Sequence, residues 1–176
     1  VAGLLGWVNS ITKDKIAAIT WEKTVTAMKE VISADDFSDA MDLTDDMTAA
    51  ATAQGGTLAA VYQAQSGGQP IGYAINVEAS GSQGTISMMV GIDMDGAVTG
   101  VSIVTNSETS GIGSKVMGNE PLTNGTGVLD QFIGKSAADG TLSVGSNVDA
   151  ITGATVSTKG VTTGVNAALA VAGVIG

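Results

Sequence analysis

The interpretation of this chain starts from one stretch of seven residues, Asp149-Ala150-Ile151-Thr152-Gly153-Ala154-Thr155. The residues after it predict a helix over residues 156–175 with one buried face, because apolar side chains recur there at helical spacing, at Val161, Val165, Leu169 and Ala172. Thr152 stands at the predicted N-cap of this helix, and the small residues Gly153 and Ala154 leave the first-turn amides accessible. Free amides at a helix start favour a bound phosphate. An ordinary threonine-capped helix without a ligand explains the same pattern, so local sequence leaves both interpretations open.

Upstream of this stretch the hydrophobic pattern becomes strand-like. Four segments predict β-strands, at residues 58–64, 71–79, 85–92 and 98–105. Short turn sequences separate them, at Gly67-Gly68, 81–84 and Asp95-Gly96. Short connections join antiparallel neighbours, so we expect an α+β fold in which an antiparallel β-meander packs with helices.

The remaining segments are interpreted from local patterns. Apolar spacing predicts a helix that extends to about residue 32, and residues 49–57 indicate a helix end followed by a glycine turn. Residues 107–115 and 118–127 are predicted loops, residues 128–135 a short helix and residues 142–144 a short strand.

The charge balance excludes a nucleic-acid partner. The chain of 176 residues has a formal net charge of −10, with seven lysines and no arginine or histidine. Nucleic-acid phosphates require a basic face, which this composition does not supply. Without arginine, any phosphate must be held by backbone amides, hydroxyls, lysine or a covalent bond.

The absence of cysteine and histidine excludes several chemistries. Thiolate metal sites, iron–sulfur clusters and Ser–His–Asp or Cys–His catalysis all need one of these residues. An acidic stretch lacks the spacing of a calcium loop, so we interpret it as a solvated face and predict no metal site; its members are Asp35, Asp36, Asp39, Asp42, Asp45 and Asp46.

The pattern Asp-x-x-Thr-Gly-Ala-Thr at residues 149–155 resembles the flavinylation motif of the FMN-binding domain family. The resemblance implies that a dedicated flavin transferase couples FMN through its phosphate to Thr155. It further implies that Thr152, Gly153, Ala154 and the helix start hold the phosphate. Asp149 matches a motif position that the transferase needs, so its implied role lies in maturation.

A second region of resemblance lies in the loop over residues 107–115. It is similar to the family's Glu-Thr-Pro-Gly-Leu-Gly loop beside the flavin ring, with Ser110 in place of proline and Ile112 in place of leucine. The resemblance therefore places five residues near the ring: Glu108, Thr109, Gly111, Ile112 and Gly113. A dinucleotide fingerprint is excluded, because Val116 stands where its third glycine would fall. A tight loop without a ligand remains the alternative.

The N-terminal residues suggest a membrane anchor. Residues 1–8 are apolar and Trp7 lies at their end, which we interpret as the end of a membrane helix; a docked N-terminus or a signal-peptide remnant are alternatives. Lys13 and Lys15 would favour a cytoplasmic flank by the positive-inside rule. The run at residues 9–16, however, resembles the segment just outside the single membrane helix of the G subunit in Rnf complexes. The segments at residues 91–101 and 131–135 also resemble this family.

The resemblance implies an organisation and a function. Residues 1–12 would end a single-pass anchor in the cell membrane, residues 13–57 would form a helical juxtamembrane and acidic segment, and residues 58–176 would form an extracytoplasmic FMN domain. The chain would relay electrons in an ion-translocating ferredoxin:NAD oxidoreductase with the other membrane subunits as partners, and would not be catalytic alone. The alternatives are the C subunit of the sodium-translocating NADH:quinone reductase, a stand-alone extracellular FMN relay and a non-catalytic binding domain.

Overall fold

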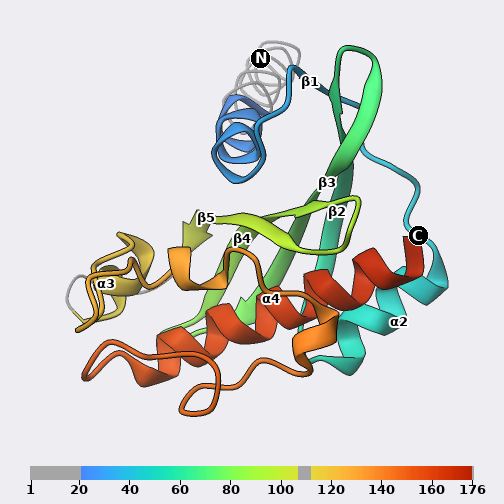
Figure 1. Ribbon diagram of the computed structural model, residues 1–176. Coiled ribbons are helices and arrows are strands. Elements are labelled where there is room, and N and C mark those ends of the chain that lie inside the picture. The colour runs from blue at the N-terminus through green and yellow to red at the C-terminus, as the bar shows by residue number, and fades with distance from the viewer. Residues whose placement is uncertain (1–20, 107–111, 176) are drawn as a thin grey trace, which may run out of the picture.

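The computed structural model describes residues 21–106 and 112–175 (Figure 1). The predicted membrane anchor at residues 1–12 lies outside the described residues. Helical residues 21–31 are followed by these elements: β1 (Asp36–Phe37), α2 (Asp45–Ala53), β2 (Thr57–Ser66), β3 (Gln69–Ser80), β4 (Thr85–Asp93), β5 (Val98–Asn106), α3 (Ile112–Met117), two short 3₁₀ helices η1 (Asp130–Phe132) and η2 (Ala137–Asp139), and α4 (Thr155–Ile175).

The strands form one antiparallel sheet in the order β1-β2-β3-β4-β5. This order confirms the predicted meander, and the α+β class is confirmed with it. The turn between β2 and β3 contains Gly67 and Gly68, whose φ angles of 58° and 78° lie in the left-handed region. Such angles are accessible to glycine at little cost, so this pair permits the tight reversal.

Helices cover both faces of the sheet. On one face lies the helix of residues 21–31, whose Met28 and Val31 pack with Met89 of β4 in one buried cluster. On the other face lie α4 and α2, which form a larger cluster that contains Met88. Successive strand residues point to opposite faces, so the two adjacent methionines of β4, both fully buried, serve different layers. The result is a sheet held between two helical layers (Figure 1).

The helix of residues 21–31 approaches the sheet closely at two glycines. Gly91 of β4 and Gly100 of β5 are register partners, and a Cβ atom built on either would lie within 2.9 Å of a backbone atom of Val31. Thr99 donates a hydrogen bond to the carbonyl of Val31 beside them. These glycines therefore make room for the end of the helix of residues 21–31. This close approach explains why glycine occupies positions 91 and 100 of the segment at residues 91–101.

The α4 helix is the central element of the larger cluster. Of the predicted apolar face, Val161 and Val165 are fully buried, Leu169 is buried and Ala172 is half-buried. Among the described residues, α4 alone is long and apolar enough to cross a membrane, but 61% of its apolar window is buried inside the protein. We therefore assign α4 to the core of the domain.

Glycine also controls how close α4 comes to the sheet. A Cβ atom on Gly160 would lie 2.5 Å from the carbonyl oxygen of Ser80, at the end of β3. A Cβ atom on Gly164 would lie 2.4 Å from the sulfur of Met88. The first neighbour is backbone and cannot move aside easily, whereas the second is a flexible side chain. Gly160 is therefore the stricter of the two constraints.

Three predicted elements differ from the structure. The helix predicted at residues 128–135 is only the three-residue η1, because Gly134 adopts a φ of 84° and its amide donates to Val98 of β5. The strand predicted at residues 142–144 is a single bridge between Val144 and Val148, and the chain turns at Gly145 with a φ of 89°.

In the loop predicted at residues 107–115, the described part from Ile112 onward is helix α3. By contrast, the acidic stretch agrees with its interpretation, because all six of its carboxylate residues are exposed. Asp45 and Asp46 lie in the first turn of α2, where the helix dipole favours negative charge.

The glycine constraint predicts the outcome of two matched substitutions in α4. We expect Gly160→Ala to destabilise the fold by about 1–3 kcal/mol, because the added methyl group collides with the Ser80 carbonyl. Gly173→Ala should be neutral or stabilise by up to about 1 kcal/mol, since a methyl group there meets nothing within 4 Å and alanine favours helix. Urea unfolding of both variants measures the difference; equal stability would show that α4 does not depend on this close approach.

Candidate functional site

The segment at residues 149–155 enters α4 through a tight turn. The amide of Ala154 donates a hydrogen bond of 2.8 Å to the carbonyl of Ile151, and Gly153 between them has a φ of 84°. Glycine with positive φ at the third position is typical of a type II turn. The amide of Thr158 then donates to the Ala154 carbonyl, and α4 begins at Thr155. The predicted N-cap role of Thr152 is therefore wrong, because the turn separates it from the helix.

Neighbouring residues of this turn have opposite exposures. Thr155, Thr152 and Gly153 are exposed, whereas Ala154 is 3% exposed and belongs to the larger core cluster. The methyl group of Ala154 therefore anchors the turn from inside. The buried methyl group thus fixes the backbone next to Thr155, and the side chain of Thr155 is accessible from solvent.

The start of α4 offers a favourable environment for a phosphate. The first amides of a helix have no intrahelical acceptor, and the dipole of a 21-residue helix places partial positive charge there. Lys159 is exposed and lies four residues after Thr155, so both side chains project from one face of the helix. Lys159 was absent from the predicted site, although its spacing from Thr155 is visible in the sequence.

Asp149 is held through its backbone and not through its side chain. Its amide donates a hydrogen bond of 2.7 Å to Oε1 of Gln131, and its carbonyl accepts one of 2.8 Å from Nε2 of the same residue. Nε2 also donates to the carbonyl of Val128. Asp149 itself is exposed, which suits a residue recognised by another protein.

The 3₁₀ helix η1 that carries Gln131 is fixed in turn. Oδ1 of Asn119 accepts a hydrogen bond of 2.7 Å from the amide of Leu129, and Phe132 is fully buried. Asn119 follows α3 and adopts a positive φ of 54°. Residues 131–135 resemble the family's sequence, so this segment could be identified from the sequence. The local pattern did not predict that the side chain of Gln131 binds the backbone of Asp149.

The described end of the predicted ring-side region lies in a helix that contacts α4. Glu108, Thr109 and Gly111 lie outside the described residues, and so does the side chain of Ile112. Gly113 lies in the first turn of α3, and α3 contacts α4. Figure 1 shows α3 beside the end of α4 where Thr155 begins the helix. Gly113 of the predicted ring-side segment and the start of α4 therefore lie in neighbouring helices.

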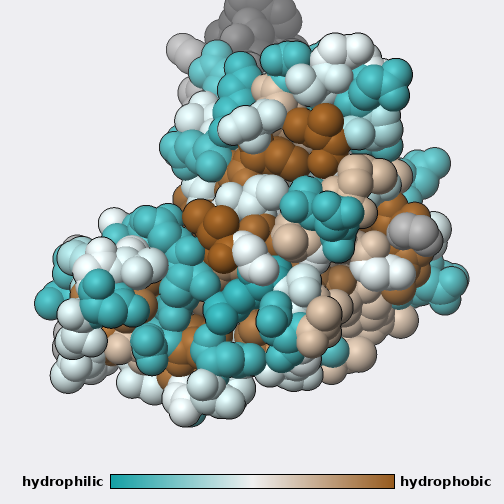
Figure 2. Space-filling model, viewed as in Figure 1, coloured by the Kyte–Doolittle hydropathy of each residue, from teal (hydrophilic) through white to brown (hydrophobic). Residues whose placement is uncertain are grey.

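The surface at this end is mainly hydrophilic on the face shown in Figure 2. Larger hydrophobic patches lie between the helix of residues 21–31 and the strands of the sheet. Among the exposed apolar side chains, Val156 directly follows Thr155 and is 57% exposed. An apolar side chain is therefore exposed to solvent next to Thr155.

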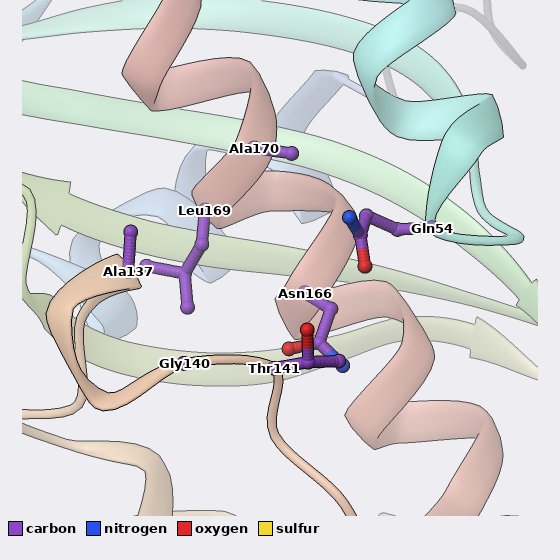
Figure 3. Close-up of a pocket in the computed structure, with 7 residues that line it drawn as sticks. All are labelled: Gln54, Ala137, Gly140, Thr141, Asn166, Leu169 and Ala170. Atoms are coloured by element: carbon purple, nitrogen blue, oxygen red, sulfur yellow. The ribbon is translucent and has the colours of Figure 1, made fainter.

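A separate groove lies farther along α4. Figure 3 shows its lining residues, which include Gln54 at the end of α2 and Asn166 and Leu169 of α4. Asn166 is eleven residues after Thr155, or about 16 Å along the helix axis at 1.5 Å per residue. This groove is therefore distinct from the start of α4.

Comparison with known proteins identifies the family. The FMN-binding domain family matches residues 81–170, which include β4, β5, the turn before α4 and most of α4. The chain belongs to the FMN-binding domain family. This finding confirms the resemblance noted in the sequence and agrees with FMN as the cofactor.

Three relatives of the chain carry the name of a G subunit. Over 119 residues the chain is 40% identical to the G subunit of the Na⁺-translocating ferredoxin:NAD⁺ oxidoreductase complex of Acetobacterium woodii, an alignment that covers 63% of this chain and 54% of that protein. It is 30% identical over 173 residues to the G subunit of the ion-translocating oxidoreductase complex of Methanosarcina acetivorans, covering 96% of this chain and 85% of that protein.

The third relative is the G subunit of the proton-translocating ferredoxin:NAD⁺ oxidoreductase complex of Clostridium ljungdahlii. It is 35% identical over 112 residues, covering 61% of this chain and 57% of that protein. The alignments thus span little more than half the length of the Acetobacterium and Clostridium proteins, and most of the Methanosarcina protein.

Proposed function

We propose that this chain is an electron-transfer subunit that carries one FMN, esterified through its phosphate to Thr155, in a membrane-bound ion-translocating ferredoxin:NAD oxidoreductase of the Rnf type. The observation that carries the proposal is the exposed Thr155 at the first position of α4, directly after the buried anchor Ala154. This arrangement occurs in a chain of the FMN-binding domain family.

Attachment requires an activated flavin donor and a flavin transferase. In flavin adenine dinucleotide the FMN phosphate is part of a phosphoanhydride. The Thr155 oxygen forms the new phosphoester bond, the anhydride bond breaks, and AMP leaves with the electron pair. The hydroxyl proton passes to a base of the transferase or to water, since this chain has no histidine to accept it.

The residues of this chain position the cofactor after attachment. The first-turn amides of α4 and the exposed Lys159 offset the phosphodiester charge. When bound, FMN supplies one- and two-electron redox chemistry, which belongs to the cofactor itself. The ring-side segment Glu108–Gly113 continues into α3, whose contact with α4 would hold that segment beside the attachment point.

The names of the relatives favour the Rnf-type complex over the alternatives. All three relatives described above are G subunits of ion-translocating complexes, and two are named for ferredoxin:NAD⁺ oxidoreduction. The proposed partners are the other membrane subunits and, during maturation, the flavin transferase. Membrane attachment through the N-terminal segment and an extracytoplasmic position of the FMN domain complete the proposal.

Thr155→Ala is expected to abolish covalent flavin and to leave the fold intact. The exposed hydroxyl is the proposed acceptor, and exposed substitutions usually change stability by less than about 0.5 kcal/mol. The measurement is flavin fluorescence of the protein band after denaturing electrophoresis, following co-expression with a transferase. Thr123→Ala, at an exposed loop threonine, is the control and should load fully. A fluorescent band in the Thr155→Ala protein would refute the attachment site.

Asp149→Ala is expected to slow flavinylation with little loss of stability. Asp149 is exposed, and its backbone bonds to Gln131 do not require the carboxylate. A transferase titration, with a thermal melt of the same samples, measures both effects. Unchanged loading across the titration would count against a maturation role.

Deletion of residues 1–12 is expected to give a folded protein that stays in solution and accepts flavin. The helix of residues 21–31 remains and continues to cover its face of the sheet. Deletion of residues 1–31 is the contrasting variant, which should aggregate because it uncovers the buried side chains of Ala74 and Met89. Size-exclusion chromatography distinguishes these outcomes, and aggregation of the shorter deletion would place residues 1–12 in the domain core.

A further inference from the structure

Two amide side chains bind the ends of the irregular segment that precedes the attachment turn. Asn166 of α4 binds the backbone of Leu142, and Gln131 of η1 binds the backbone of Asp149. Each side chain accepts a hydrogen bond from the amide and donates one to the carbonyl of the same residue. The segment between these residues is thereby fixed at both ends.

We propose that Gln131 is a positioning residue for flavin attachment. Its two hydrogen bonds to the backbone of Asp149, called the clasp below, hold the motif in the conformation that the transferase recognises. The inference rests on the proposed attachment at Thr155. It assigns a role to a residue outside the motif, which reaches the motif only through the folded structure.

The position of the clasp between two buried residues supports this role. Val148 is 2% exposed and Ala154 is 3% exposed, whereas the five residues between them are exposed or half-buried. The hydrogen bond from the Ala154 amide to the Ile151 carbonyl orders the end of this stretch, but without a further contact its start would sample many backbone conformations. The two hydrogen bonds between Gln131 and the backbone of Asp149 fix the direction in which the chain leaves Val148, and this direction sets where the Asp149 carboxylate points.

Contacts with the hydrophobic core hold Gln131 in place. Gln131 precedes the fully buried Phe132, and its Nε2 is also bonded to the Val128 carbonyl at 2.9 Å. Asn119 caps the same 3₁₀ helix through the amide of Leu129. The amide group of Gln131 is therefore preorganised to bind the backbone of Asp149.

The substitution Gln131→Glu changes this contact with a minimal change of shape. A glutamate still accepts from the Asp149 amide, but at neutral pH it has no proton to donate to the carbonyls of Asp149 and Val128. Its second oxygen would face two carbonyl oxygens, which opens the clasp. Gln131→Ala removes both bonds without adding charge.

Asn166→Asp provides a matched control. It makes the same chemical change in a clasp of the same type, in which the Leu142 amide and carbonyl both lie 2.9 Å from the Asn166 side chain. Figure 3 shows Asn166 beside Thr141 in the groove of α4. The control lies about 16 Å along the helix axis from Thr155, so it affects the same segment without reaching the motif.

The experiment measures steady-state flavinylation of the full chain by a purified transferase, with FAD as donor. We expect Gln131→Glu and Gln131→Ala to raise the KM for the protein substrate about tenfold, the order of magnitude expected for loss of one or two hydrogen bonds of modest net strength. The KM for FAD should not change, and Asn166→Asp should behave like the unsubstituted chain. Thermal melts report whether each variant folds.

Two outcomes overturn the inference. One is an unchanged KM for both Gln131 variants; the other is an equal increase for Asn166→Asp, which would indicate a general effect of loosening the segment. Amide hydrogen exchange gives a test independent of turnover: Gln131→Ala should lose protection at the Asp149 amide, and retained protection would refute the clasp. Failure of the attachment proposal looks different, since the unsubstituted chain would then remain unloaded or Thr155→Ala would be loaded.

Discussion

The close approach of α4 to the sheet at Gly160 determines where the candidate site lies. Because a Cβ atom there would reach within 2.5 Å of the Ser80 carbonyl, only glycine allows this helix to sit at its observed distance. The contact lies five residues after Thr155, so it fixes the second turn of α4 against the end of β3. The buried Ala154 provides a second anchor just before the helix. Together they fix the backbone on both sides of Thr155, the proposed attachment residue.

On the opposite face of the sheet, glycines also allow a helix to approach closely, and there they hold the helix of residues 21–31. Gly91 and Gly100 admit the backbone of Val31, and the Thr99 hydroxyl bonds its carbonyl. Burial against this layer also raises the pKa of Tyr62, whose ring contacts Trp21. The helix of residues 21–31 is therefore part of the folded unit. A chain that continues from it toward a membrane would be attached to the domain through a packed helix.

Sequence patterns predicted the elements whose burial is regular. The four long strands, their glycine turns and α4 follow from apolar residues that recur at strand or helical spacing, because most of these residues are buried or half-buried in the structure. The segment from residue 118 to residue 154 has no such period. Its conformation depends on single side chains that bind distant backbone, as Gln131 does to Asp149 and Asn166 does to Leu142. The motif at residues 149–155 could be recognised from its amino-acid sequence. The turn that separates Thr152 from the helix could not, because it depends on the positive φ of Gly153.

The attachment of one FMN to Thr155 is tested most directly by the intact mass of the chain produced with and without a flavin transferase. Fragmentation of the peptide that contains residues 149–159 then locates the modified residue. We expect a mass increase of one FMN less one water, found only with the transferase and located on Thr155. An unchanged mass, or the same increase located on another residue, would contradict the proposed attachment.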